Sequence, residues 1–239
     1  MMTKSKMLSC IILAGLAVSS PAQDNFQVGL NFMVGLPQNE FEKHVENNGY
    51  GGSGYFTYRL PGTPIRAGAA IGFLIYGSET REVPWGHGIP VWVDVTTTNS
   101  ILTGHLFARI QPVQGVFQPY LEGLYGFNYL STRTTVENQE ESEDDDEIAS
   151  STNYDDAAGS YGYGGGLMFR VYQARQDQIE GTKSLGIWVD FGLRSMKGGE
   201  AKYLKEGSIT EDENGNFIYD LQRSTTDLLT WHLGVVFTF

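Results

Sequence analysis

Residues Leu229 to Phe239 read L-T-W-H-L-G-V-V-F-T-F. Large apolar side chains occupy every second position of this stretch, and the positions between them are mostly small or polar. Successive side chains of a strand point to opposite faces, so the pattern predicts a β-strand with one wholly apolar face. Its length matches the roughly 9–11 residues that a tilted strand needs to cross a bilayer.

Seven further stretches show the same alternation, which predicts about eight strands and no convincing helix. These stretches are Phe26–Leu36, Tyr50–Leu60, Ile65–Tyr76, Ile101–Ile110, Phe117–Leu130, Ser160–Tyr172 and Leu185–Arg194. Val91 to Thr98 is expected to extend the fourth strand, with a bulge or break because its apolar residues have the opposite parity. Asn214-Gly215 is a type I′ hairpin signal, so part of the last long connection is expected to form a two-stranded projection.

The connections between these strands alternate long, short, long, short, long, short, long. With an even number of strands, both termini and all short turns lie on one side, and the long loops lie on the other. This asymmetry is typical of outer-membrane barrels. The predicted fold class is therefore all-β: a transmembrane up-and-down antiparallel β-barrel of about eight strands, with short periplasmic turns and long extracellular loops.

The composition narrows the function classes. The chain has 239 residues and a net charge of -12, and no basic patch is present, which argues against nucleic-acid binding. Glycine is abundant, at 30 residues, and aromatics make up 13%. Beyond the N-terminal segment no apolar run approaches the roughly 18 residues of a membrane helix, so membrane insertion has to use strands.

Residues 1–22 have the pattern of a secretory signal peptide. Lys4 and Lys6 precede an apolar run, and Ser20-Pro21-Ala22 offers a cleavage site, which leaves residues 23–239 as the barrel domain. Cys10, the only cysteine, lies in a segment that resembles a lipoprotein box, but it precedes the apolar run instead of closing it, which disfavours a lipid anchor. The mature chain would then have neither a disulfide nor a reactive thiol.

The two faces of the strands could be arranged in two ways. A secreted lipocalin-like barrel would put the apolar face inside, but large apolar side chains from every strand would crowd an interior that eight strands only just fill. We therefore expect the mixed face inside, with a polar network toward the periplasmic end. The predicted lumen residues are Arg59, Arg66, His105, Arg109, Glu122, Arg170, Asp190, Arg194 and His232.

Several motifs do not qualify as chemical sites. The glycines between 162 and 166 lie inside an alternating strand and not before a helix, as a phosphate loop requires. The acidic run Glu137 to Glu147 lacks the spacing of an EF-hand and reads as a solvated loop that could meet an extracellular ligand or cation. His44 and His87 are isolated. No metal or cofactor site is predicted.

An outer-membrane enzyme that modifies lipid would need a histidine, a serine and an acid in one place. His105 and His232 are inward strand residues, but the sequence places no serine at a convincing shared height with either. A catalytic triad is recognised by its geometry. No catalytic residue is therefore predicted, and we expect a protein that is not an enzyme.

The chain resembles the small bacterial outer-membrane β-barrel families, the OmpX/OmpA-transmembrane-like and porin-like domains. The resemblance rests on the signal peptide, the repeated alternation, the loop asymmetry and the terminal Phe239. It implies export to the outer membrane, contact with membrane lipid and lipopolysaccharide, and a structural or surface-interaction role. The alternative role is a narrow pore or transporter for small or hydrophobic solutes. The resemblance also implies a signal for the barrel-assembly machinery in the last strand, at Trp231, Leu233, Val235, Phe237 and Phe239.

Overall fold

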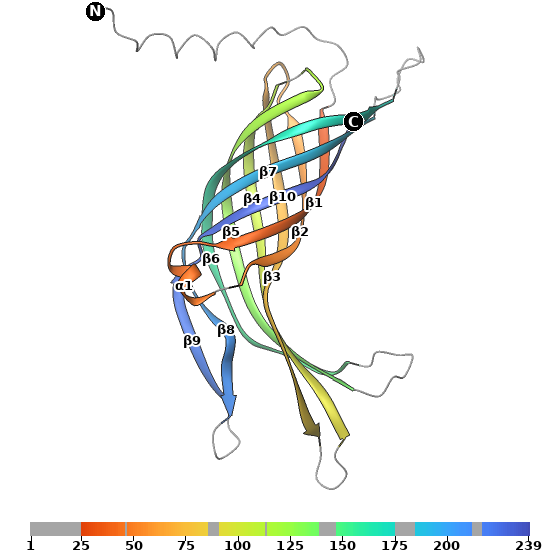
Figure 1. Ribbon diagram of the computed structural model, residues 1–239. Helices are drawn as coiled ribbons and strands as arrows, with labels where there is room; N and C mark the ends of the chain where they lie inside the picture. Colours follow the sequence, from red (N-terminus) through yellow and green to blue (C-terminus); the bar gives the residue numbers. More distant parts are fainter. Residues whose placement is uncertain are drawn as a thin grey trace, which may run out of the picture.

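The computed structural model describes residues 25–45, 47–85, 91–112, 114–138, 147–174, 185–211 and 217–239. Within these ranges eight strands form a closed ring in the order β1-β10-β7-β6-β5-β4-β3-β2 (Figure 1). The ring consists of β1 (Phe26–Pro37), β2 (Gly49–Arg59), β3 (Ile65–Trp85), β4 (Val91–Ile110), β5 (Phe117–Asn138), β6 (Glu147–Gln173), β7 (Gly186–Gly198) and β10 (Leu228–Thr238). The predicted eight-stranded antiparallel barrel is confirmed.

The first and last strands close the barrel. β1 and β10 pair antiparallel over eleven residue pairs, from Gln27 with Thr238 to Pro37 with Leu228. Phe26 and Phe239 extend the pairing, since each backbone N–H donates to the carbonyl of the other residue, at 3.0 and 3.1 Å. Every strand of the ring therefore has a hydrogen-bonded neighbour on both sides, and the barrel has no free edge along the shared length of its strands.

The apolar parity of the strands faces outward. Leu30, Leu106 and Leu121 are 62%, 67% and 70% exposed, and comparable apolar side chains surround the barrel. Aromatic rings cluster at the rim near the termini, where Phe26 stacks on Phe239 with ring centroids 6.1 Å apart. This is the outward apolar band of a transmembrane barrel, and the soluble alternative with the faces reversed is wrong.

Strands β3 to β6 continue well past the apolar band, as Figure 1 shows for the two long hairpins. β4 runs without interruption from Val91 to Ile110, so the bulge predicted for that strand is not found there. The irregularity lies on its partner β3, where Tyr76 is skipped between the pairs Ile75–Ser100 and Gly77–Asn99. The extra residue shifts the parity of β3, whereas β4 keeps one parity throughout, so Val93, which is 1% exposed, lies on the same inward face as Ile101.

A small cap lies at the mouth of the barrel on the side of the long connections. It combines α1 (Glu40–His44) with a separate hairpin, β8 (Glu200–Glu211) and β9 (Phe217–Thr225). The predicted two-stranded projection is confirmed, whereas α1 was not predicted, because five residues are too few to show a helical period. Among the described residues, no helix is long and apolar enough to cross a membrane.

Phe41 holds the cap to the barrel. Its side chain is fully buried, and its ring lies 5.2 Å from that of Tyr203 on β8 and 5.9 Å from that of Tyr76 on β3. Asp227, just before β10, links the segment before α1 to the end of β7, because its carboxylate accepts from the Gly198 N–H at 3.0 Å and from Asn39 Nδ2 at 2.8 Å. The cap is therefore fixed both by aromatic packing and by one carboxylate.

The interior has two zones. The inward positions near the short turns hold the charged residues together with Met168 and Trp188, whereas those toward the cap include large apolar side chains, for example Leu74, Ile101 and Leu130, each 1% exposed. The predicted polar network therefore does not account for the outer half of the interior. There, an apolar core fills the barrel and continues into the cap.

Some predicted features lie outside the described residues. These are the signal peptide at 1–22 with Cys10, most of the acidic run Glu137–Glu147, His87, most of the connection at 173–183, and the Asn214-Gly215 turn. The signal peptide stays a prediction.

Replacing Phe41 with Ala should release the cap while leaving the barrel closed. Loss of a buried Phe costs about 3–5 kcal/mol, which lowers the free energy of local opening. We expect trypsin to cleave at Lys202 and Arg223 at least ten times faster in the variant, with the strand content by circular dichroism unchanged. Leu221→Ala, which truncates an exposed side chain of β9, is the control, and equal cleavage rates in the two variants would contradict the role of Phe41.

Candidate functional site

The lumen contains a row of charged residues on neighbouring strands. Arg59 pairs with Arg66, Arg66 with Arg109, and Arg109 with Glu122, so four consecutive strands contribute one residue each. All four are at most 4% exposed. They lie at the ends of their strands next to the short turns, which explains their similar depth.

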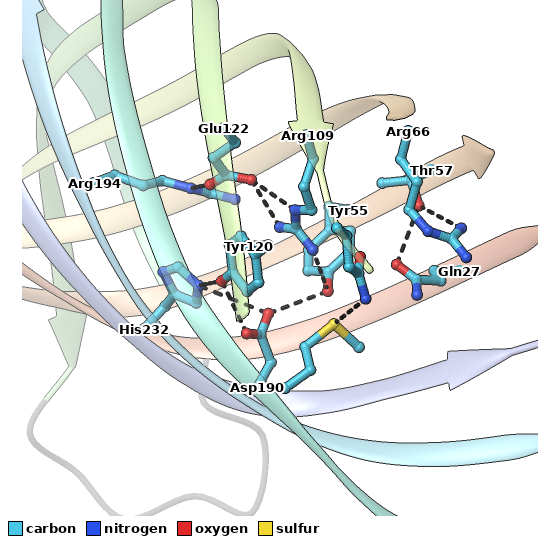
Figure 2. Close-up of polar contacts among 12 residues, drawn as sticks. Gln27, Tyr55, Thr57, Arg66, Arg109, Tyr120, Glu122, Asp190, Arg194 and His232 are labelled. Carbon is cyan, nitrogen blue, oxygen red and sulfur yellow. Dashed lines mark hydrogen bonds and ion pairs between the residues drawn. The ribbon is translucent and has the colours of Figure 1, made fainter. Parts of the chain in front are cut away.

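Glu122, the last member of this row and its only carboxylate, bridges two arginines. Its Oε2 accepts from Nε and Nη2 of Arg109 at 2.9 and 2.8 Å, and its Oε1 accepts from Nε of Arg194 at 2.7 Å (Figure 2). Arg194 lies on β7, so it must reach across β6 to β5. Gly164 on β6 makes this possible, because a Cβ there would lie only 2.9 Å from Arg194 Cγ.

Asp190 forms a second centre beside the first. Its two oxygens accept from the Tyr55 hydroxyl at 3.1 Å and from the Tyr120 hydroxyl at 2.9 Å. Arg109 Nη1 donates to Tyr55 at 3.3 Å, which joins the two centres. The Tyr120 hydroxyl donates its only hydrogen bond to Asp190. In its 2.9 Å contact with His232 the hydroxyl is therefore the acceptor, and Nε2 of the imidazole is the donor.

Tyr120 spans the interior by lying over two glycines. It pairs with Gly166 on β6, which pairs with Gly192 on β7, which pairs with His232 on β10. A Cβ on either glycine would come within 2.5 Å of the Tyr120 hydroxyl. The guanidinium carbon of Arg109 lies 3.9 Å from the centre of the Tyr120 ring, which adds a cation–π contact.

The formal charges of this lumen network cancel. We use this name for Tyr55, Arg109, Tyr120, Glu122, Asp190, Arg194 and His232, most of which are labelled together in Figure 2. The two guanidinium groups of Arg109 and Arg194 meet the two carboxylates of Glu122 and Asp190. Buried charges are tolerated only when they are paired and hydrogen-bonded. Here the carboxylates accept at both oxygens, so the network forms a densely bonded layer across the barrel, in which Arg194 Nη2 and His232 Nδ1 have no hydrogen-bond partner among the described residues.

The structure places the other predicted lumen residues around this layer. Arg66 donates to the Asn25 carbonyl at 3.3 Å and to Thr57 Oγ1 at 3.5 Å, on the side of the short turns. Arg59 is buried there as well. Arg170 is half-buried, and its guanidinium carbon lies 5.3 Å from the ring centre of Trp188.

His105 lies toward the apolar half, where its Nε2 is 3.2 Å from Ser160 Oγ. The sequence-based statement that no serine shares its height is therefore wrong. Ser160 is on β6, and Gly126 of β5 lies between the two residues in the register. Both side chains are buried, and no carboxylate is hydrogen-bonded to His105 among the described residues. Among the described residues, this pair thus lacks the acid that orients the histidine in a catalytic triad.

Two residues of the network were not predicted, Tyr55 and Tyr120. Both have the inward parity of Arg59 and Glu122, so strand parity could have identified them. In the described part of the chain, no group of three or more His, Cys, Asp or Glu residues could hold a metal ion.

No protein-family model matches the chain, and no curated protein matches it. Similar solved structures include Neisserial surface protein A, with a TM-score of 0.38 and 9% identity over 92% of this chain and 98% of that chain. Another is Ail, the attachment invasion locus protein of Yersinia pestis, in complex with the heparin analogue sucrose octasulfate. Its TM-score is 0.34, with 14% identity over 90% of this chain and 97% of that chain. Because these TM-scores and identities are low, the fold is assigned from the strand pairing of this chain and not from the similarity.

Glu122→Gln should destabilise the barrel strongly, because it leaves Arg109 and Arg194 buried with only one counter-charge. Breaking a buried ion pair costs about 3–5 kcal/mol. The free energy of unfolding can be measured by urea titration in detergent micelles, followed by tryptophan fluorescence. The control Asp220→Asn, which removes an exposed carboxylate of β9, should leave the free energy of unfolding unchanged.

The double variant Glu122→Gln, Arg194→Met restores the balance of charge and should recover part of the loss. A Glu122→Gln variant as stable as the Asp220→Asn control would show that the network does not depend on this carboxylate.

Proposed function

We propose that the protein is a sealed integral barrel of the outer membrane with a structural or surface-interaction role. The observation that carries the proposal is the closed lumen. The lumen network lies in the half near the short turns, and an apolar core extends from its aromatic and methionine side chains to the cap. Eight strands leave an interior just wide enough for side chains, so an ion would have to displace both layers to cross.

The outer surface supports the membrane location. Trp231, Leu233 and Val235 on β10 are 42%, 54% and 40% exposed, where they face lipid and where the assembly machinery would read the last strand. Phe237 and Phe239 continue this face to the rim. Export by a signal peptide and contact with lipopolysaccharide are parts of the same proposal.

The surface beyond the membrane is strongly acidic. Of the 28 acidic residues, all but five lie in the long connections and in the strands that lead to them. The five exceptions are Asp24, Glu122, Asp177, Glu180 and Asp190. This concentration of negative charge at the end of the barrel with the long connections repels anionic partners and attracts cations. We therefore propose that the extracellular ligand is a cation or a basic surface, with the barrel as its anchor.

A narrow pore for small or hydrophobic solutes is the competing function, and conductance separates the two. The purified protein, inserted in a planar bilayer in concentrated KCl, should show no stepwise current above the leak of the bare bilayer. A porin inserted in the same membrane provides the positive control.

Regular unitary steps from the wild-type barrel would contradict the sealed lumen. The variant Arg109→Ala, Glu122→Ala, Arg194→Ala opens only one of the two layers and should also remain closed, because the apolar core stays in place.

A further inference from the structure

Two glycines interrupt the apolar belt on the outer face of β2. Gly52 lies between Phe32 of β1 and Phe73 of β3, and Gly54 lies between Leu30 of β1 and Ile71 of β3. These four neighbours are 46% to 62% exposed, so they stand out from the sheet on both sides. The result is a groove of about 640 Å³ with β2 as its floor.

The fold does not require glycine at these two positions. A Cβ on Gly54 would meet Leu30 Cδ2 at 3.6 Å, and a Cβ on Gly52 would meet only the Asn31 carbonyl oxygen at 3.4 Å. Neither residue has a positive φ. By contrast, a Cβ on the inward Gly51 would lie 1.9 Å from the Phe73 carbonyl oxygen. Gly51 is needed for strand packing, whereas Gly52 and Gly54 only leave space on the outer face.

The dimensions of the groove fit a single hydrocarbon chain. Neighbouring strands are about 4.8 Å apart, so the walls on β1 and β3 rise from backbones roughly 10 Å apart, and their side chains narrow the opening. A helix about 10 Å in diameter is too wide to enter. Along β2 the groove is bounded by Tyr50 and Phe56, which are 55% and 46% exposed.

The position of the groove identifies the occupant. It is continuous with the apolar belt, so its surroundings are lipid. Tyr50 is the second residue of β2 and follows the connection that contains α1, which places the groove in the half of the membrane nearest the cap. A second copy of the barrel would need about 800 Å² per partner, far more than a groove whose floor reaches only from Gly52 to Gly54.

We propose that this groove binds one acyl chain of an outer-leaflet lipid, with the chain lying along β2 between the walls of β1 and β3. The proposal rests on the outer-membrane location proposed above. It assigns a lipid site to a defined part of a belt that is otherwise covered by lipid without preference. Contacts with the chain come from Leu30, Phe32, Ile71 and Phe73, and the backbone at Gly52 and Gly54 forms the floor.

Native mass spectrometry of the detergent-purified protein tests the proposal with dipalmitoylphosphatidylcholine as the probe. The wild-type protein should retain one lipid at probe concentrations where Gly54→Leu, which fills the groove, retains at least fivefold less. Gly123→Leu is the matched control, because Gly123 is exposed and a Cβ there meets nothing within 4 Å. It should bind as the wild type does. Dihexanoylphosphatidylcholine, with the same headgroup and short chains, should not compete.

Three outcomes would overturn the proposal. They are equal lipid retention by Gly54→Leu and wild type, equal competition by the short-chain lipid, and a wild-type dimer that Gly54→Leu converts to a monomer. Each protein is first shown to be folded by its electrophoretic mobility before and after boiling. A folded barrel with no groove-dependent lipid removes this proposal alone, whereas a chain that never enters the membrane removes the proposed function.

Discussion

The hydrogen bonds between β1 and β10 are the constraint on which the rest of the structure depends. Hydrocarbon offers no partner to a backbone N–H or C=O, so a sheet that crosses a membrane has to close on itself. Here the two ends of the described chain provide the closing strands, and Phe26 and Phe239 exchange the final pair of hydrogen bonds. Asp227 continues the seam beyond the membrane by joining β7, the start of β10 and the segment before α1.

Closure fixes what the interior can hold. The ring brings Arg194, Asp190 and His232 from β7 and β10 to side chains of β2, β4 and β5, and inward glycines provide the room. Tyr120 lies over Gly166 and Gly192, and Arg194 passes Gly164. Large side chains on one strand are thus matched by missing side chains on the next. The charges cancel within the lumen network, which is the condition for burying them at tolerable cost.

The outward glycines, unlike several of the inward ones, are not required by packing. Several inward glycines are required because a Cβ would collide with a neighbouring strand or ring, but Gly52, Gly54 and Gly123 have no such neighbour. Outside the barrel a missing side chain shapes the surface that lipid meets. Glycine therefore allows close packing of side chains on the inner face of the sheet and leaves a groove on the outer face.

Much of the fold could be predicted from the sequence, because alternation reports directly which face of a strand meets lipid. The depth of Arg109 and Glu122 was also predictable, since both flank one short turn. The contacts of Arg194, Asp190 and His232 were not, because they depend on the stagger between strands, which is set only when the barrel closes. The pairing of His105 with Ser160 was missed for the same reason.

Two further features left no periodic signal in the sequence. α1 is shorter than two turns of helix, so the single apolar pair Phe41 and Val45 is too short to show a helical period. The outer parts of β3 to β6 extend past the apolar band, where neither face has to be apolar, so strict alternation disappears and the strands appear to end too early.

Electrophoretic mobility with and without boiling is the most direct test of the closed transmembrane barrel. The full chain is expressed in a Gram-negative host, the outer membranes are isolated, and the protein is run on a denaturing gel. The account predicts that the protein is found in the membrane fraction and that the unboiled form migrates differently from the boiled one. A soluble product whose mobility is the same before and after boiling would contradict closure in the membrane.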